Sequence, residues 1–228
     1  MISLYVQAPF AVFRTFTAGN FRPTAGFLTH SAAYGLVLNI AGIDSRLDDG
    51  ESAMTLMRAD LPSVKIALGA LCFPQVQSLY QQGHNYPVGN TGVERAPLTK
   101  GNKYNITPIR RELLSNLRAY ICLDGNSDLE QRVRNGLAGH YNTTRYGVPF
   151  LGDNNFMIDV LREEGERQPA YWYATITESD GRGPRPRTTR LTLSIDRQNM
   201  AKTKSALFAP SPEQTLAIPE NAWALVPA

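Results

Sequence analysis

The sequence has little of what metal, redox and membrane proteins depend on. Cysteine occurs only twice, at Cys72 and Cys122, each time within an apolar run. A zinc site needs about four ligands at short spacing, so these two are predicted to be buried free thiols in a reducing compartment. No apolar run approaches the roughly 20 residues of a membrane span, and no signal-peptide pattern follows Met1. We therefore expect a cytoplasmic protein that uses no metal or other cofactor and contacts no membrane.

The sequence also lacks the common catalytic motifs. Its histidines are His30, His84 and His140, and none has the spacing of a metal site. There is no nucleophile elbow and no glycine-rich nucleotide motif with a lysine, and the acidic residues are too scattered for a two-metal nuclease. Metal-independent RNA cleavage stays open, because His84 with Tyr86 and Lys100 or Lys103 contain the groups that a general base and a general acid require.

What is present favours a globular protein with a mild basic bias. The 228 residues suit one domain, or one domain with a small appendage, and 43% hydrophobic residues are enough for a sizeable core. The net charge is only +3, so the distribution of charge along the chain is more informative than its sum.

The first 44 residues are predicted to contain a strand, a basic loop and a helix. Residues 3–13 are predicted to form the strand. The loop has Arg14 and Arg22 at its edges, and the helix that follows has Thr29 or Ser31 as its N-cap. Such a loop can place backbone N–H and guanidinium groups on one anionic strand. The same pattern also suits an ordinary first strand and first helix of an α/β domain.

A second strand is predicted at residues 64–77, interrupted at Pro74, and it leads into an unusual segment. Residues 80–111 are poor in large aliphatic side chains and rich in glycine, asparagine, proline and threonine. A structureless loop of this length is uncommon, so we expect an extended hairpin or arm that projects from the sheet. Its basic residues are Arg95, Lys100, Lys103, Arg110 and Arg111. They suit a nucleic-acid backbone, and the alternative is a solvated loop with incidental charge.

The second half of the chain alternates predicted elements with glycine-containing and basic loops. The expected elements are a strand in the second half of 111–123, a helix capped by Ser127, a short helix or turn at 157–168, strands at 170–177 and 191–195, and a tail of turns that ends in a short strand near 223–226. The loop at 140–156 holds Arg145, Tyr146 and Gly147, which can grip a phosphate, stack a base and allow close backbone approach. The alternative there is a tight turn. A further basic loop spans 181–190.

Residues 4–44 read LYVQAPFAVFRTFTAGNFRPTAGFLTHSAAYGLVLNIAGID. This stretch resembles the start of the CRISPR-associated Cas-five family of type I Cascade complexes, a branch of the RAMP superfamily, and within it the DevS-like group of type I-B loci. The matching residues are Phe13, Arg14, Arg22, Pro23, Thr24, Ser31, Ala32, Tyr34, Gly35 and Leu36. The arm at 84–111 and the GVPFLG segment at 147–152 match more loosely, and residues after 195 match by position only.

The resemblance implies an α+β fold. A ferredoxin-like, RRM-type core would span residues 1–165, including a β-hairpin thumb at about 80–111, and a small C-terminal β region would span 166–228. The implied function is that of a non-catalytic RNA-binding subunit of Cascade. It would hold and cap the 5′ handle of the CRISPR RNA and contact the backbone subunits and the large subunit. Target DNA near the PAM end is a further candidate partner.

The implied handle-binding residues are mostly arginines, lysines and aromatic or small side chains, as splayed single-stranded RNA requires. They are Arg14, Arg22, Thr24, Ser31, Tyr34, Arg46, Lys100, Lys103, Arg110, Arg111, Arg145, Tyr146 and Gly147. One branch of the family cuts the precursor RNA and resembles an enzyme that has adjacent lysine and histidine. Here Lys100 is followed by Gly101 and Lys103 by Tyr104, so we expect no catalytic activity. The alternatives are a processing endoribonuclease and a protein-interaction module with incidental charge.

Overall fold

The computed structural model of the chain describes residues 1–15, 21–47, 50, 56–87, 104–141, 147–176, 185–197 and 199–227. In these ranges the α-helices are α1 (His30–Ile40) and α2 (Ser127–Leu137), and the two short 3-10 helices are η3 (Met200–Lys202) and η4 (Glu220–Ala222). The strands are β1 (Ile2–Ala11), β2 (Phe21–Arg22), β3 (Arg46–Leu47), β4 (Leu56–Met57), β5 (Val64–Ala70), β6 (Gln75–Pro87), β7 (Tyr104–Asp124), β8 (Val160–Glu163), β9 (Tyr171–Thr175), β10 (Thr189–Ser194), β11 (Lys204–Pro210) and β12 (Ala224–Val226). None of the described helices is long and apolar enough to cross a bilayer.

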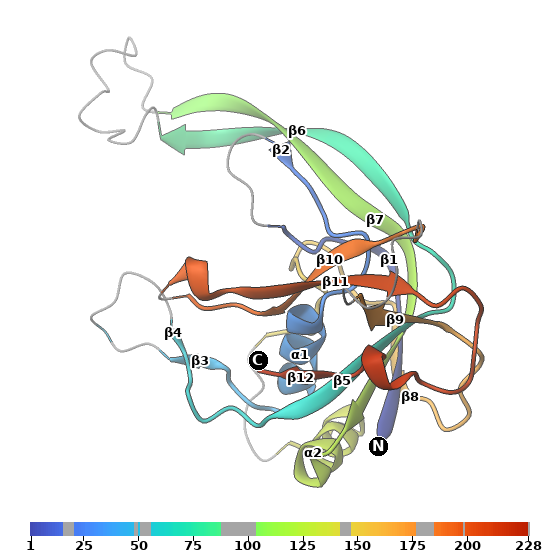
Figure 1. The fold of residues 1–228 in the computed structure, drawn as a ribbon. Coiled ribbons are helices and arrows are strands. Elements are labelled where there is room, and N and C mark those ends of the chain that lie inside the picture. Colours follow the sequence, from blue (N-terminus) through green and yellow to red (C-terminus); the bar gives the residue numbers. More distant parts are fainter. Residues whose placement is uncertain are drawn as a thin grey trace.

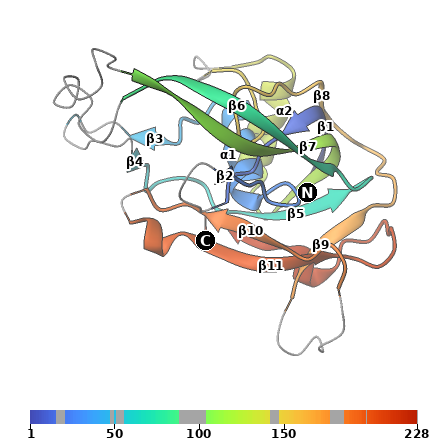
Figure 2. The same ribbon diagram turned by 90° about the horizontal axis from the view of Figure 1, so that it is seen from above.

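Most of the described strands belong to one sheet, which is wrapped around α1 (Figure 1). Its main path runs β10-β11-β9-β5-β7-β1-β8, with β12 paired to β5, and β2 and β6 paired to β7. The strands β5, β7, β1 and β8 are antiparallel neighbours, and α1 follows β1 while α2 follows β7. The β9–β11 side of the sheet lies across α1 from α2 (Figure 2). The short strands β3 and β4 pair separately.

The sheet has an apolar core on each face. Successive side chains of a strand point to opposite sides, so Ile66 and Leu68 of β5 enter the larger core with both helices, whereas Ala67 enters a smaller core on the other face. The C-terminal strands complete both cores, with Tyr173 in the larger and Trp172 in the smaller. No separate core marks the described residues after 165, and the expected division of the chain there stays a prediction.

The expected projecting hairpin is present. β6 pairs antiparallel with β7, from Gln75 opposite Ser115 to Pro87 opposite Tyr104. The predicted interruption at Pro74 is the turn that separates β5 from β6. The two strands of the hairpin curve away from the body of the molecule (Figure 1). The rest of the arm, residues 88–103, lies outside the described residues.

The first helix is capped by Thr29, one of the two caps that the sequence left open, whereas three other details were wrong. The Thr29 hydroxyl oxygen accepts a hydrogen bond from the Ala32 N–H at 3.2 Å. The cap of α2 is Asn126 rather than Ser127. Residues 157–168 contain the strand β8 instead of a helix or turn, because β1 offers an edge with which they pair. The tail contains the strand β11, which pairs with β10 and β9.

His30 at the start of α1 should make the fold sensitive to acid. Its side chain is fully buried, its ring centroid lies 4.7 Å from that of Phe208, and neither ring nitrogen has a partner among the described residues. Burial lowers the pKa of His30 from 6.5 to about 3. Below about pH 6.5 the imidazole of His30 therefore binds a proton in the unfolded chain but stays neutral in the folded chain. The free energy of unfolding falls as the pH drops through this range. We expect a loss of about 2 kcal/mol at pH 5 from this group.

The measurement is urea unfolding at pH 7.5 and pH 5. His30→Leu should remove about 2 kcal/mol of the pH dependence, and His140→Leu, at an exposed position, should not. If the two variants depend on pH as the wild type does, the buried imidazole is not the cause.

Candidate nucleic-acid interface

The chain turns back after β1 and brings distant arginines together at the root of the hairpin. An isolated bridge joins Arg14 to Thr24, and the Thr24 hydroxyl accepts a hydrogen bond from the Phe13 N–H at 3.0 Å. β2 then runs parallel to β7, which places Arg22 opposite Arg111. We call the resulting set the basic cluster, and its members are Arg14, Arg22, Arg110 and Arg111.

Asp153 anchors two arginines of the basic cluster. Its carboxylate oxygen Oδ2 accepts a hydrogen bond from Arg111 Nη2 and lies 3.4 Å from Arg14 Nη2. The side chain of Asp153 is 2% exposed and that of Arg111 is 7% exposed, whereas that of Arg14 is 63% exposed. Burial raises the pKa of Asp153, but the Asn155 N–H and the guanidinium groups of Arg111 and Arg14 outweigh it, so the pKa lies below its usual value. Asp153 is therefore an ionised anchor beneath an exposed arginine.

Gly152 allows this anchor to reach the root of the hairpin. Its backbone φ is +75°, and a Cβ on it would lie 2.0 Å from the Val12 carbonyl oxygen. The neighbouring Leu151 is fully buried, so the segment is packed tightly against the end of β1. Sequence reasoning picked out the glycine-containing loop but missed Asp153. The available signal was a lone acid directly after a glycine in a segment expected to lie beside basic residues.

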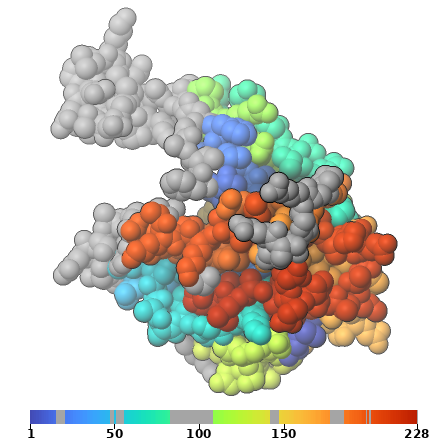
Figure 3. Space-filling view, in the orientation of Figure 1, coloured from blue at the N-terminus to red at the C-terminus, as the bar shows by residue number. Residues whose placement is uncertain are grey.

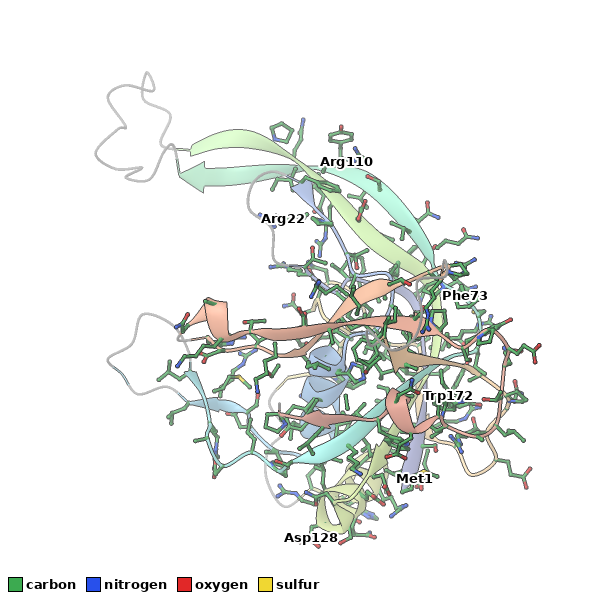
Figure 4. The ribbon with its side chains drawn as sticks, in the orientation of Figure 1. Met1, Arg22, Phe73, Arg110, Asp128 and Trp172 are labelled. Atoms are coloured by element: carbon green, nitrogen blue, oxygen red, sulfur yellow. The ribbon has the colours of Figure 1, made fainter. Side chains whose placement is uncertain are left out.

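Two arginines of the basic cluster, Arg14 and Arg110, have exposed side chains. Arg110 is exposed, with its guanidinium carbon 5.3 Å from the centre of the Phe21 ring and its Nε donating to Ser78 Oγ at 2.9 Å. Figure 4 shows Arg110 and Arg22 on the neighbouring strands of the hairpin root. Together with the exposed Arg14, Arg110 can bind phosphate oxygens through charge-assisted hydrogen bonds.

Other expected handle-binding residues lie elsewhere or serve the fold. Tyr34 is buried, its hydroxyl donates to the Pro62 carbonyl at 2.7 Å, and burial raises its pKa to about 12. Tyr34 and the buried Arg111 therefore present too little surface to grip RNA directly, which corrects the expectation for both. Ser31 is half-buried in the first turn of α1, and Arg46 is exposed on β3, in the separate two-stranded sheet.

Two of the remaining expected residues, Gly147 and Thr24, are described by the structure, and four are not. Gly147 is exposed and has a φ of +67°, a backbone conformation that glycine adopts readily, and its expected role in a close backbone approach stays a prediction. Thr24 is buried at the bridge to Arg14, and its N–H donates to Glu112 Oε2 at 3.3 Å. The other members of the set lie outside the described residues, and they are Lys100, Lys103, Arg145 and Tyr146.

The face of the sheet that lies opposite the two helices is largely covered by the C-terminal region. An RRM-type surface would stack bases on aromatic residues of the two central strands, where Tyr5 of β1 lies opposite Tyr120 of β7. Tyr120 is only 2% exposed, because Trp172 and Ala222 of the C-terminal region pack over it. Its hydroxyl accepts a hydrogen bond from the Gln168 N–H at 3.0 Å. The exposed positive charge at the hairpin root is therefore the better candidate interface.

Comparison with known proteins finds similarity in structure alone. No protein-family model matches the chain, and no curated protein matches its sequence. Among solved structures, 25 chains match. One belongs to a structure titled "CRISPR RNA-guided surveillance complex", with a TM-score of 0.55 and 12% identity over 97% of this chain and 95% of that one. The protein therefore has a fold that resembles a subunit of a CRISPR RNA-guided surveillance complex.

Proposed function

We propose that this chain is the RNA-binding subunit of a type I CRISPR Cascade complex that holds and caps the 5′ handle of the CRISPR RNA. The observation that carries the proposal is the pair of exposed arginines, Arg14 and Arg110, at the root of a projecting hairpin. Single-stranded RNA exposes both phosphates and unstacked bases, and arginines beside a glycine-containing loop suit both. The similarity to a surveillance-complex subunit makes a guide RNA the natural ligand.

The strand order supports the finer assignment. Along the chain, β1, α1, β5, β7, α2 and β8 give a βαββαβ order, and the sheet order β8-β1-β7-β5 is antiparallel throughout. We take this as the ferredoxin-like core of a RAMP protein, with the β6–β7 hairpin as its thumb. On this proposal the chain belongs to the Cas-five family, in a DevS-like, type I-B-like branch. It would contact the backbone subunits, the large subunit and target DNA near the PAM end.

The proposed subunit does not cut RNA. Of the histidines, His30 is buried and has no exposed face for RNA, and His140 is exposed on the segment after α2. The side chain of His84 lies outside those described. We expect purified protein to leave labelled repeat RNA intact in the absence of metal. Site-specific cleavage that is lost on His84→Ala would favour the endoribonuclease instead.

The proposal predicts a salt-dependent affinity that the two exposed arginines control. We expect Arg14→Ala combined with Arg110→Ala to weaken binding of a repeat-derived handle RNA by about 10-fold or more. Each lost phosphate contact should lower the slope of log affinity against log salt concentration by about 0.7, so the double variant should lose about 1.4. The measurement is filter binding at several salt concentrations.

The matched control removes the same charge elsewhere. Lys65→Ala combined with Lys204→Ala takes two positive charges from exposed positions on β5 and β11. This control should keep the wild-type slope. Equal losses in the two double variants would mean that net charge, rather than the hairpin root, determines binding.

A further inference from the structure

Arg187 occupies a backbone position that normally belongs to glycine. It is the third residue of a β-turn in which the Thr188 N–H donates to the Arg185 carbonyl at 3.4 Å, and its φ is +62°. A turn with proline at its second position and positive φ at its third is of type II, which favours glycine or asparagine at the third. A large side chain at a strained position points to a use for that side chain.

The side chain of Arg187 forms the outer layer of a stack. Its guanidinium carbon lies 4.1 Å from the centre of the Phe73 ring, and the Phe73 ring is stacked on Tyr171 with 4.5 Å between centroids. Arg187 is exposed, whereas Phe73 and Tyr171 are half-buried. The stack is therefore anchored on β9 and ends in a planar cation at the surface.

This stack lies at the base of the hairpin whose strand β7 carries Arg110 further along. Phe73 is in the turn between β5 and β6, at the root of the hairpin (Figure 4). Two residues after Arg187, Thr189 Oγ1 accepts a hydrogen bond from the Gly26 N–H at 3.0 Å, which ties β10 to the loop after Thr24. Figure 3 shows N-terminal residues, in blue, at the surface between the hairpin and the β10–β11 layer, in orange, although most of the loop after Thr24 is buried and only Gly26 is exposed.

We propose that the Arg187–Phe73–Tyr171 stack is a docking position for one unpaired base of single-stranded RNA, with the base lying on the exposed guanidinium plane. Arginine planes and aromatic rings are the surfaces on which proteins stack splayed bases. The covered sheet face leaves Tyr120 unable to do so, and the stack supplies a planar surface at the hairpin root instead. The inference rests on the proposed RNA-binding function. It deepens that function, because residues of the C-terminal region would then contact one base of the RNA.

The test uses the full chain and a repeat-derived handle RNA that carries 2-aminopurine at one position at a time. For the wild type, we expect one position at which binding changes the fluorescence through stacking. Arg187→Gly should abolish that change and weaken binding by about 5-fold or more, the effect of one lost base stack. Its melting temperature should stay the same or rise, because glycine suits the positive φ. Arg187→Lys should keep the charge but lose the signal, since an ammonium group has no stacking plane.

The control is Arg162→Ala, which removes an equal charge and a guanidinium that lies 4.7 Å from the centre of the Tyr5 ring. It should leave the fluorescence change intact. If the wild type binds no RNA, the proposed function and this inference are both wrong. If the wild type binds and Arg187→Gly keeps the fluorescence change and the affinity, only the stacking position falls. A variant that loses stability and affinity together, yet keeps the fluorescence change at saturating RNA, would make Arg187 a structural clamp and overturn the inference.

Discussion

Asp153→Asn should lower the free energy of unfolding by about 3 kcal/mol or more. The substitution keeps the shape of the side chain but removes the charge that balances Arg111, whose side chain is 7% exposed. A buried guanidinium without a counter-charge cannot be solvated by water, and the loss of one partner of a buried ion pair typically costs 3–5 kcal/mol. The measurement is chemical denaturation at neutral pH, with RNA affinity measured on the same protein.

The control for this variant is Glu163→Gln. Glu163 pairs with Arg134 at 3.0 Å, but the two side chains are 41% and 37% exposed, so its removal should cost less than about 1 kcal/mol. The effect at Asp153 should also depend on pH. Because the folded pKa of Asp153 is depressed, its contribution is present above the usual carboxyl pKa and is lost as the pH falls through the folded value. The free energies of unfolding of the wild type and of Asp153→Asn should thus converge in acid. If Asp153→Asn and Glu163→Gln cost the same at neutral pH, the Asp153 pair is no stronger than a surface pair.

Gly152→Ala should destabilise the protein by about 2–5 kcal/mol. The left-handed backbone conformation, with φ of +75°, costs an L-residue about 1–2 kcal/mol. The new Cβ would also lie 2.0 Å from the Val12 carbonyl oxygen, a backbone atom that cannot turn away as a side chain can. The backbone and side-chain shifts that such overpacking forces typically cost a further 1–3 kcal/mol. Thermal or urea unfolding measures the sum.

Gly147 provides a matched control in the same loop. Its φ is +67°, but nothing lies within 4 Å of the position that a Cβ would occupy. Gly147→Ala should therefore show the conformational cost alone, about 1–2 kcal/mol. The difference between the two variants isolates the close approach to Val12. If the two substitutions destabilise equally, the loop does not depend on tight packing against the end of β1. Movement of Asp153 in Gly152→Ala should also weaken RNA binding, because Arg14 would lose its anchor.

The candidate site was only partly predictable from the sequence. Arg14 and Arg110 were expected at an RNA surface, and their exposure at the hairpin root is compatible with that role. Tyr34 and Arg111 were expected there too, yet both are buried, because side chains of one strand or helix alternate between core and surface in a way that composition does not reveal. Asp153 was missed, because a single acid after a glycine is a weak signal that does not show which arginines it will meet.

Local pattern was sufficient for the elements that depend on neighbouring residues. The Thr29 cap, the break at Pro74 and the hairpin each follow from short-range chemistry, namely a hydroxyl that satisfies a free N–H, a ring that cannot donate, and a run without a helical period. Long-range pairing was decided by tertiary structure alone. β8 exists because β1 offers it an edge, and Arg187 reaches Phe73 because β10 and the hairpin root meet in space. Contacts between residues far apart in sequence depend on sheet register and burial, and no local window contains both partners.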